Sequence, residues 1–146
     1  MDVVSASSED SAALWSFFQR VSSTNWSESL LAQSLSNQRS LLAKQKGVIV
    51  GYCIAQQTLD ELCIEDIAVD PHFMRQGIAK KLMQHLFTEA LQQGVSSIFL
   101  EVRRSNKAAI QLYKSVDFQR VGIRKSYYPS SEHLPKEDAI VMQRLV

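Results

Sequence analysis

The segment Glu65–Ala90 holds the residues whose types and order are best suited to chemistry. It reads as an apolar strand end, a turn at Asp70-Pro71, a short basic loop around Gly77 and an amphipathic helix. Glycine lets the backbone approach a ligand, and the free N–H groups of a first helical turn can donate to phosphate. Arg75 and Lys80 add positive charge beside that turn. The segment therefore predicts a site for a phosphate-bearing cofactor, and hence an enzyme.

The same loop also fits a second interpretation. The run Met74-Arg75-Gln76-Gly77-Ile78-Ala79-Lys80 is equally compatible with a helix that begins at a glycine and carries solvated basic side chains. The preceding strand end, Ile67-Ala68-Val69-Asp70-Pro71, favours the cofactor site. Ligands of open α/β sheets bind beyond the carboxyl ends of strands, at the point where this loop follows its strand.

The bulk composition predicts one folded domain over residues 1–146. Hydrophobic residues make up 45%, charged residues 21%, and the formal net charge is +1. A charge this small predicts no long-range attraction to nucleic acid or membrane, although a local basic patch stays compatible with it. Residues 1–15 lack the basic and apolar regions of a signal peptide, and no apolar run approaches the roughly 18 residues of a membrane span. We therefore expect a cytoplasmic protein.

The two cysteines, Cys53 and Cys63, both lie in apolar, strand-like runs. We expect both to be buried free thiols. A disulfide is the less favoured alternative, because nothing else in the sequence indicates secretion. The chain has no CxxC or CxH spacing, so we expect no metal site.

Hydrophobic periodicity predicts a mixed sheet with helices on its faces, an α/β (α+β) architecture. Helices are expected after Ser8, after Ser27 beyond a break at Ser22–Thr24, over Gly77–Leu91, and over Asn106–Val116 with Ser105 as its cap. Strands are expected at Val3–Ala6, Leu41–Ala43, Val48–Ala55, Glu61–Val69, Ile98–Val102, Phe118–Arg124 and Ala139–Met142. The first four form an antiparallel meander, and the third helix predicts a parallel crossover between the fourth and fifth.

These motifs resemble the GCN5-related N-acetyltransferase superfamily, whose signature is Gln/Arg-x-x-Gly-x-Gly/Ala at a helix start. Gly77 and Ala79 match its small positions, whereas Met74 stands where Gln or Arg is usual. The resemblance implies a fold whose central strands splay apart, with acetyl-CoA as cosubstrate. It implies a pyrophosphate on the amides of Arg75, Gln76, Gly77, Ile78, Ala79 and Lys80. It also implies a pantetheine arm paired with Ile67, Ala68 and Val69, where a bulge would aim an amide at the thioester carbonyl.

The resemblance is tighter to the branch of this superfamily that acetylates the N-terminal alanine of bacterial ribosomal proteins. The residues that carry it include Leu100–Arg103, Leu112-Tyr113, Tyr127-Tyr128-Pro129 and Glu137-Asp138-Ala139. It implies an N-α-acetyltransferase that acts by direct attack in a ternary complex, with a ribosomal-protein N-terminus as partner. Acetylation of an internal lysine or a small amine, or a non-catalytic acyl-CoA-binding module, remain the alternatives. Asp117 departs from the pattern, which usually has glycine there.

The same resemblance assigns roles to three residues. Glu101 would accept the proton of the amine through water, Tyr113 would donate a proton to the leaving thiolate, and Asn106 would contact the cofactor. Without the resemblance, Glu101 would be an ordinary solvated acid at a strand end, and Tyr113 an ordinary core tyrosine on an apolar helix face. The loop from Tyr127 to Lys136 lies where this family closes over the acceptor peptide, and a surface loop pinned by its tyrosines is the equally favoured alternative.

Overall fold

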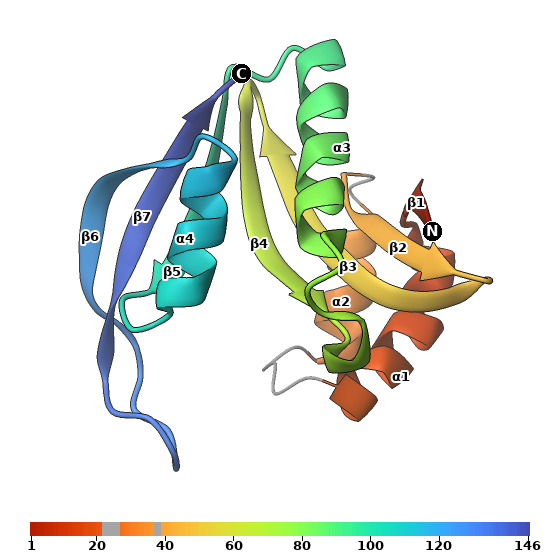
Figure 1. Ribbon diagram of the computed structural model, residues 1–146, viewed down its shortest axis with the longest axis horizontal. Helices are drawn as coiled ribbons and strands as arrows, with labels where there is room; N and C mark the ends of the chain where they lie inside the picture. Colours follow the sequence, from red (N-terminus) through yellow and green to blue (C-terminus); the bar gives the residue numbers. More distant parts are fainter. Residues whose placement is uncertain (22–26, 37–38) are drawn as a thin grey trace.

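The computed structural model describes residues 1–21, 27–36 and 39–146, which form one seven-stranded mixed sheet with helices on both faces (Figure 1). The strands are β1 (Asp2–Ser5), β2 (Leu41–Gln45), β3 (Val48–Thr58), β4 (Glu61–Val69), β5 (Ser97–Arg103), β6 (Gln119–Tyr128) and β7 (Glu137–Leu145). The helices are α1 (Ser11–Val21), α2 (Glu28–Leu35), α3 (Ile78–Gln92) and α4 (Lys107–Ser115), with short 3₁₀ turns at Ser8–Asp10 and Pro71–Phe73.

The strand order is β1-β2-β3-β4-β5-β7-β6. The first four strands form an antiparallel meander, whose β2–β3 turn is made by Lys46 and Gly47 at φ 51° and 79°. Only β4 and β5 run parallel among the described strands, and α3 connects them. The predicted meander and parallel crossover are therefore confirmed.

Alternating residues of β3 supply two separate cores. Cys53 and Ala55 are fully buried in a cluster with α3, α4 and the C-terminal strands. Tyr52 and Ile54 point the other way and are buried with α1 and α2. This period of two is what a strand covered on both faces requires, and Figure 1 shows α3 and α4 over one face of the sheet.

The helix starts differ in detail from the sequence-based expectation. Ser7 caps the first turn, which is 3₁₀ before α1 begins. At α2 the predicted Ser27 cap is confirmed, with its Oγ accepting the Leu30 N–H at 3.1 Å. The prediction of Ser105 as cap of α4 was wrong: the Asn106 Oδ1 accepts the Ala109 N–H at 3.2 Å. The predicted break at Ser22–Thr24 lies outside the described residues.

Two further expectations were wrong. Tyr127 and Tyr128 belong to the end of β6 and not to the loop that follows it. Cys63 is exposed, whereas Cys53 is buried as expected. Along β4 the residues Glu61, Cys63 and Glu65 alternate with buried ones and so share the exposed face of the strand.

None of the helices in the described part of the chain combines the length and the apolar character that a membrane span needs.

Asp117 lies in the left-handed region, at φ 72°, immediately after α4. Its own N–H donates to the Lys114 carbonyl at 3.1 Å, and the Phe118 N–H donates to the Tyr113 carbonyl at 3.0 Å, the arrangement that ends a helix at a left-handed residue. After α3 the corresponding position is Gly94, at φ 74°. Glycine takes this conformation without the steric cost of a Cβ.

We therefore predict that Asp117→Gly raises the free energy of unfolding by about 0.5–1 kcal/mol, because it removes left-handed strain at a compatible site. Urea denaturation followed by circular dichroism measures the change. Asp117→Ala is the matched control and should lower stability, since alanine tolerates this conformation less well than aspartate. A glycine variant no more stable than the alanine variant would contradict this explanation.

Candidate active site

The central strands β4 and β5 are hydrogen bonded along their first halves only. Glu61–Ile64 pairs with Ser97–Leu100, and the pairing of the described strands ends there. On its other side, β4 shifts register with β3 and forms a bulge at Glu65. A bulge bends and twists its strand, so the second half of β4 diverges from β5. The expected splay is thus present, with the bulge at Glu65 and not within Ile67–Val69.

The divergence of the two strands leaves a cavity of about 410 Å³, called here the interstrand cavity. It is lined by Ile64, Glu65, Asp66, Ile67, Leu100, Glu101, Val102, Arg103, Asn106, Tyr113 and Tyr128. Polar side chains dominate this lining, and the two residues expected to move protons, Glu101 and Tyr113, both take part in it.

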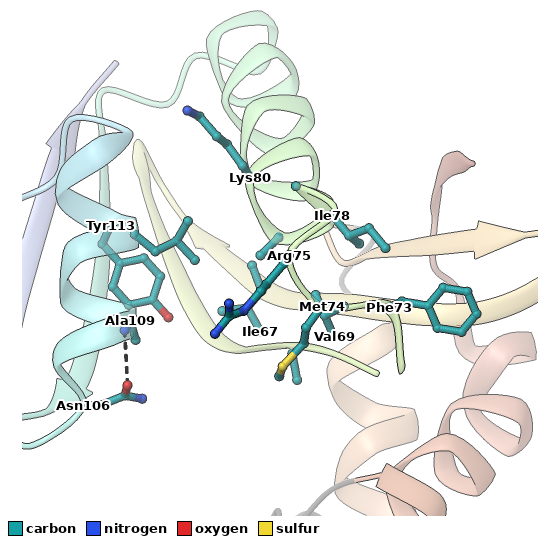
Figure 2. Close-up of a pocket in the computed structure, with 14 residues that line it drawn as sticks. Ile67, Val69, Phe73, Met74, Arg75, Ile78, Lys80, Asn106, Ala109 and Tyr113 are labelled. Atoms are coloured by element: carbon teal, nitrogen blue, oxygen red, sulfur yellow. Dashed lines mark hydrogen bonds between the residues drawn. The ribbon is translucent and has the colours of Figure 1, made fainter. Parts of the chain in front are cut away.

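A second cavity of about 480 Å³, called here the α3 cavity, lies between the start of α3, the end of β4 and α4 (Figure 2). It is lined by Ile67, Ala68, Val69, Phe73, Met74, Arg75, Gly77, Ile78, Ala79, Lys80, Asn106, Ala109, Leu112 and Tyr113. All the residues predicted to bind the cofactor lie here except Gln76, which does not line it. Residues from the end of β4, a loop and two helices, some of them distant in sequence, thus line one cavity. Tyr113 lines this cavity and the interstrand cavity as well.

The start of α3 supplies hydrogen-bond donors to this cavity. Gly77 is its N-cap, at φ 77°, and within the described residues no side chain caps the helix. The Lys81 N–H donates to the Gly77 carbonyl at 3.0 Å, so the N–H groups of Ile78, Ala79 and Lys80 precede the ladder of helix hydrogen bonds. With the positive end of the helix dipole, these groups have the geometry and charge that suit an anion.

The loop before α3 is held by Asp70, which is buried. Its Oδ1 accepts the His72 N–H at 2.9 Å, and the Phe73 N–H donates to its carbonyl at 2.8 Å. The backbone hydrogen bond from His72 lowers the pKa of the Asp70 carboxyl. Arg75 adopts φ 63°, a conformation that no local sequence pattern predicts for it, and its side chain lies in the α3 cavity (Figure 2).

Tyr113 lies on the face of α4 that points toward both cavities. The residue is only 8% exposed, and its ring contacts Phe118 edge-on at 6.0 Å between centroids. Burial raises the pKa of its hydroxyl, and the negative charge of Asp66 raises it further. The hydroxyl therefore keeps its proton throughout the neutral range.

Glu101, on β5, is held by an arginine from β6. The Arg124 Nη1 lies 2.6 Å from the Glu101 Oε1, which makes a charge-assisted hydrogen bond. The same guanidinium lies 4.8 Å from the ring centroid of Tyr127. The charge of Glu101, partial burial and a hydrogen bond to that carboxylate raise the pKa of Tyr127. The role of Arg124 could not be predicted from the sequence, because strand β7 separates β6 from β5 and the register of these strands cannot be derived from spacing.

A similar unit lies at the ends of the same strands. The Arg103 guanidinium lies 4.4 Å from the ring centroid of Tyr128, and its Nη1 is 3.2 Å from the Glu137 Oε2. The Glu137 Oε1 accepts the Ser105 N–H at 2.6 Å, and these contacts lower the pKa of Glu137. The Glu-Asp-Ala motif that carried part of the resemblance thus has a structural role, which is to fix the start of β7 against the end of β5.

Neither cysteine is activated as a nucleophile. Burial raises the pKa of the Cys53 thiol to about 12. Cys63 is exposed, yet partial burial of its thiol and the charges of Glu65 and Glu101 raise its pKa as well. A reactive cysteine needs a lowered pKa, so both thiols stay protonated near neutral pH. In the described part of the chain, no group of three or more histidine, cysteine or acidic residues is arranged to hold a metal ion.

Comparison with known proteins agrees with this geometry. The Acetyltransferase (GNAT) family matches residues 9–118. The [Ribosomal protein bS18]-alanine N-acetyltransferase of Escherichia coli K12 is 38% identical over 141 residues, which cover 96% of this chain and 94% of that protein. The protein of the same name from Haemophilus ducreyi is 39% identical over 118 residues, or 80% of this chain and 81% of that protein.

Solved structures give the same assignment. The crystal structure of the ribosomal-protein-S18-alanine N-acetyltransferase from Escherichia coli matches with a TM-score of 0.90 and 37% identity, over 99% of this chain and 93% of that one. Chaetomium thermophilum Naa20, solved with a bisubstrate analogue, matches with a TM-score of 0.84 at 22% identity, over 100% of this chain and 87% of that one, a likeness of fold alone. The expected fold is confirmed, and the chain belongs to the GNAT family of acetyltransferases.

Proposed function

We propose that this acetyltransferase transfers the acetyl group of acetyl-CoA to the N-terminal α-amine of a ribosomal protein that begins with alanine, in the cytoplasm. The observation that carries the proposal is the pair of joined cavities, one beside the anion-binding start of α3 and the other holding a carboxylate, with Tyr113 lining both. The alanine acceptor is supported by relatives that bear that name and align along nearly the whole chain.

Residues of the α3 cavity suit each part of coenzyme A. The N–H groups at the start of α3 and the charges of Arg75 and Lys80 would hold the pyrophosphate. The second half of β4, Ile67–Val69, lies beyond the end of the pairing with β5. Its backbone groups on that edge need hydrogen-bond partners, which the amides of a pantetheine arm can provide. Asn106, on the facing helix end, lies within reach of the same arm.

The chemical step requires two proton transfers. The amine nitrogen attacks the thioester carbon, a C–N bond forms, and the C–S bond breaks. Glu101 would take the proton released by the amine, directly or through a water molecule. Tyr113 would give its proton to the departing sulfur. Because a phenol with a pKa of about 10 or above is a weak acid, it can protonate the thiolate only in close contact with it in the transition state. Both side chains line the interstrand cavity, where these events would occur.

The acid–base chemistry favours an α-amine as acceptor. At pH 7 an α-amine with a pKa near 8 costs roughly 1.4 kcal/mol to neutralise, whereas a lysine amine with a pKa near 10.4 costs roughly 4.6 kcal/mol. A single carboxylate paired with an arginine is a weak base. It is therefore better matched to an amine that is already partly neutral.

Peptide assays test the acceptor. Purified protein with acetyl-CoA should acetylate a peptide that begins with alanine, and mass spectrometry should locate the acetyl group on the α-amine. The matched control is the same peptide with a blocked N-terminus and one internal lysine, and we expect at least 100-fold lower kcat/KM for it. Equal or greater activity on the lysine peptide or on a small polyamine would refute the proposed acceptor.

Tyr113→Phe tests the proton donor. Loss of the hydroxyl should lower kcat by about 10²–10⁴-fold, the usual size of a general-acid contribution, with little change in the KM for acetyl-CoA. Because burial raises the pKa of Tyr113, its acidic form persists at high pH, and the wild-type kcat should not fall from tyrosine ionisation between pH 8 and 10. Thermal unfolding of the variant controls for misfolding. An unchanged kcat would remove Tyr113 from this role.

Cys63→Ser tests whether acetyl transfer is direct. Since the pKa of Cys63 is raised and Cys53 is buried, we expect the variant to keep kcat/KM within about threefold. Initial rates at varied acetyl-CoA and peptide should give intersecting double-reciprocal lines, the pattern of a ternary complex. Parallel lines, which indicate a covalent acetyl-enzyme, together with an inactive variant, would overturn direct transfer.

A further inference from the structure

Arg124 contacts Glu101 across an intervening strand. In the register of the C-terminal strands, Glu101 of β5 lies opposite Val141 of β7, and Arg124 of β6 lies opposite Ala139. The arginine therefore extends over β7 to reach the carboxylate at 2.6 Å. Its side chain is 56% exposed, whereas that of Glu101 is 25% exposed. The contact therefore joins an exposed guanidinium to a mostly buried carboxylate at hydrogen-bond distance.

We propose that Arg124 is the positioning residue of the proton acceptor: it binds one carboxylate oxygen of Glu101 and so holds the carboxylate in the orientation that takes the proton of the acceptor amine. This inference rests on the proposed role of Glu101. One oxygen, Oε1, accepts from the guanidinium, and Glu101 also faces the interstrand cavity. The guanidinium thereby orients the base.

The surroundings of Glu101 make this cation necessary. The titratable and charged groups near the carboxylate are Cys63, Glu65 and Asp66 on β4, Arg103 on β5, Tyr113 on α4, and Arg124, Tyr127 and Tyr128 on β6. The two acids on β4 disfavour a further negative charge beside them, and Arg103 is engaged with Glu137. Among the described residues, Arg124 is therefore the cation that directly balances Glu101.

Tyr127 gives the contact a second point of attachment. The guanidinium lies against its ring, 4.8 Å from the centroid, and the hydroxyl of Tyr127 interacts with Glu101, which raises the pKa of that tyrosine. Arginine stacks on aromatic rings and donates in a planar fork, whereas lysine offers a point charge. Lysine at position 124 should therefore preserve the charge and lose part of the orientation.

The test is the pH dependence of kcat/KM for the alanine peptide, measured from pH 5 to 9 in wild type, Arg124→Gln, Arg124→Lys and Arg104→Gln. Removal of a cation beside a carboxylate makes the carboxylate bind a proton at higher pH. Arg124→Gln should therefore lower kcat/KM at pH 7 by about 10–100-fold. It should also move the acidic limb of the pH profile, where kcat/KM falls as the pH is lowered, to higher pH. Arg124→Lys should return the limb toward the wild-type position. Arg104→Gln breaks a 3.5 Å ion pair with Asp138, away from both cavities, and should leave rate and profile unchanged.

A double-mutant cycle with Glu101→Gln separates this inference from the proposed function. If Arg124 acts through Glu101, Arg124→Gln has no further effect on kcat/KM once Glu101 is replaced. A drop in rate without a shifted limb, equal in Arg124→Gln and Arg124→Lys, would show a merely structural arginine and overturn the proposal. Full activity of Glu101→Gln would instead overturn the proposed proton acceptor. If Glu101→Gln loses most of its kcat/KM while the pH profile of Arg124→Gln matches that of the wild type, Glu101 keeps its proposed role and the positioning role of Arg124 is refuted.

Discussion

The site depends on the interruption of hydrogen bonding between two neighbouring strands. β4 and β5 begin as an ordinary parallel pair and then separate, because β4 carries a bulge at Glu65. In a continuous sheet the backbone groups of β4 beyond that point would bond to β5, and side chains would fill the space between the strands. The separation leaves these backbone groups for a ligand and opens the interstrand cavity. The bulge is thus a functional feature of the strand.

The other elements hold the two sides of this opening in place. One half of the sheet carries α3, whose N-terminal donors follow directly from the end of β4. The other half carries α4, which brings Tyr113 to the same opening, and the β6–β7 hairpin, which brings Arg124 into contact with Glu101. Two arginine–tyrosine–carboxylate units, centred on Arg103 and Arg124, connect β6 and β7 to β5. Charge-assisted hydrogen bonds with stacked rings are well suited to fix β6 and β7 against β5.

Much of the fold follows from local patterns in the sequence. The bounds of β4 agree with its alternation and with the turn at Asp70-Pro71, and the positive φ of Gly77 agrees with its place before an amphipathic helix. The exposure of Cys63 could not be read in the same way, because an apolar neighbourhood in sequence does not say which face of a strand a helix covers. The cap of α4 was misassigned by one residue because serine and asparagine are about equally good caps.

The electrostatic part of the site depends on register, which spacing alone does not provide. Arg124 reaches Glu101 only because β7 is inserted between β5 and β6, and because β6 is irregular in its pairing on both sides of that arginine. The bulge at Glu65 likewise depends on a register shift against β3. The family resemblance named Glu101 and Tyr113, but neither the resemblance nor the spacing indicated which neighbours set their protonation.

The most direct test of the account is to titrate coenzyme A into ¹⁵N-labelled protein and to follow the backbone amide resonances. If the start of α3 and the free edge of β4 hold the cofactor, the largest shifts will fall on the amides of Ile67–Val69 and Arg75–Lys80, with smaller changes at Asn106. Shifts confined to the opposite face of the sheet, around Gln56 and Phe99, or no shifts at millimolar coenzyme A, would contradict it.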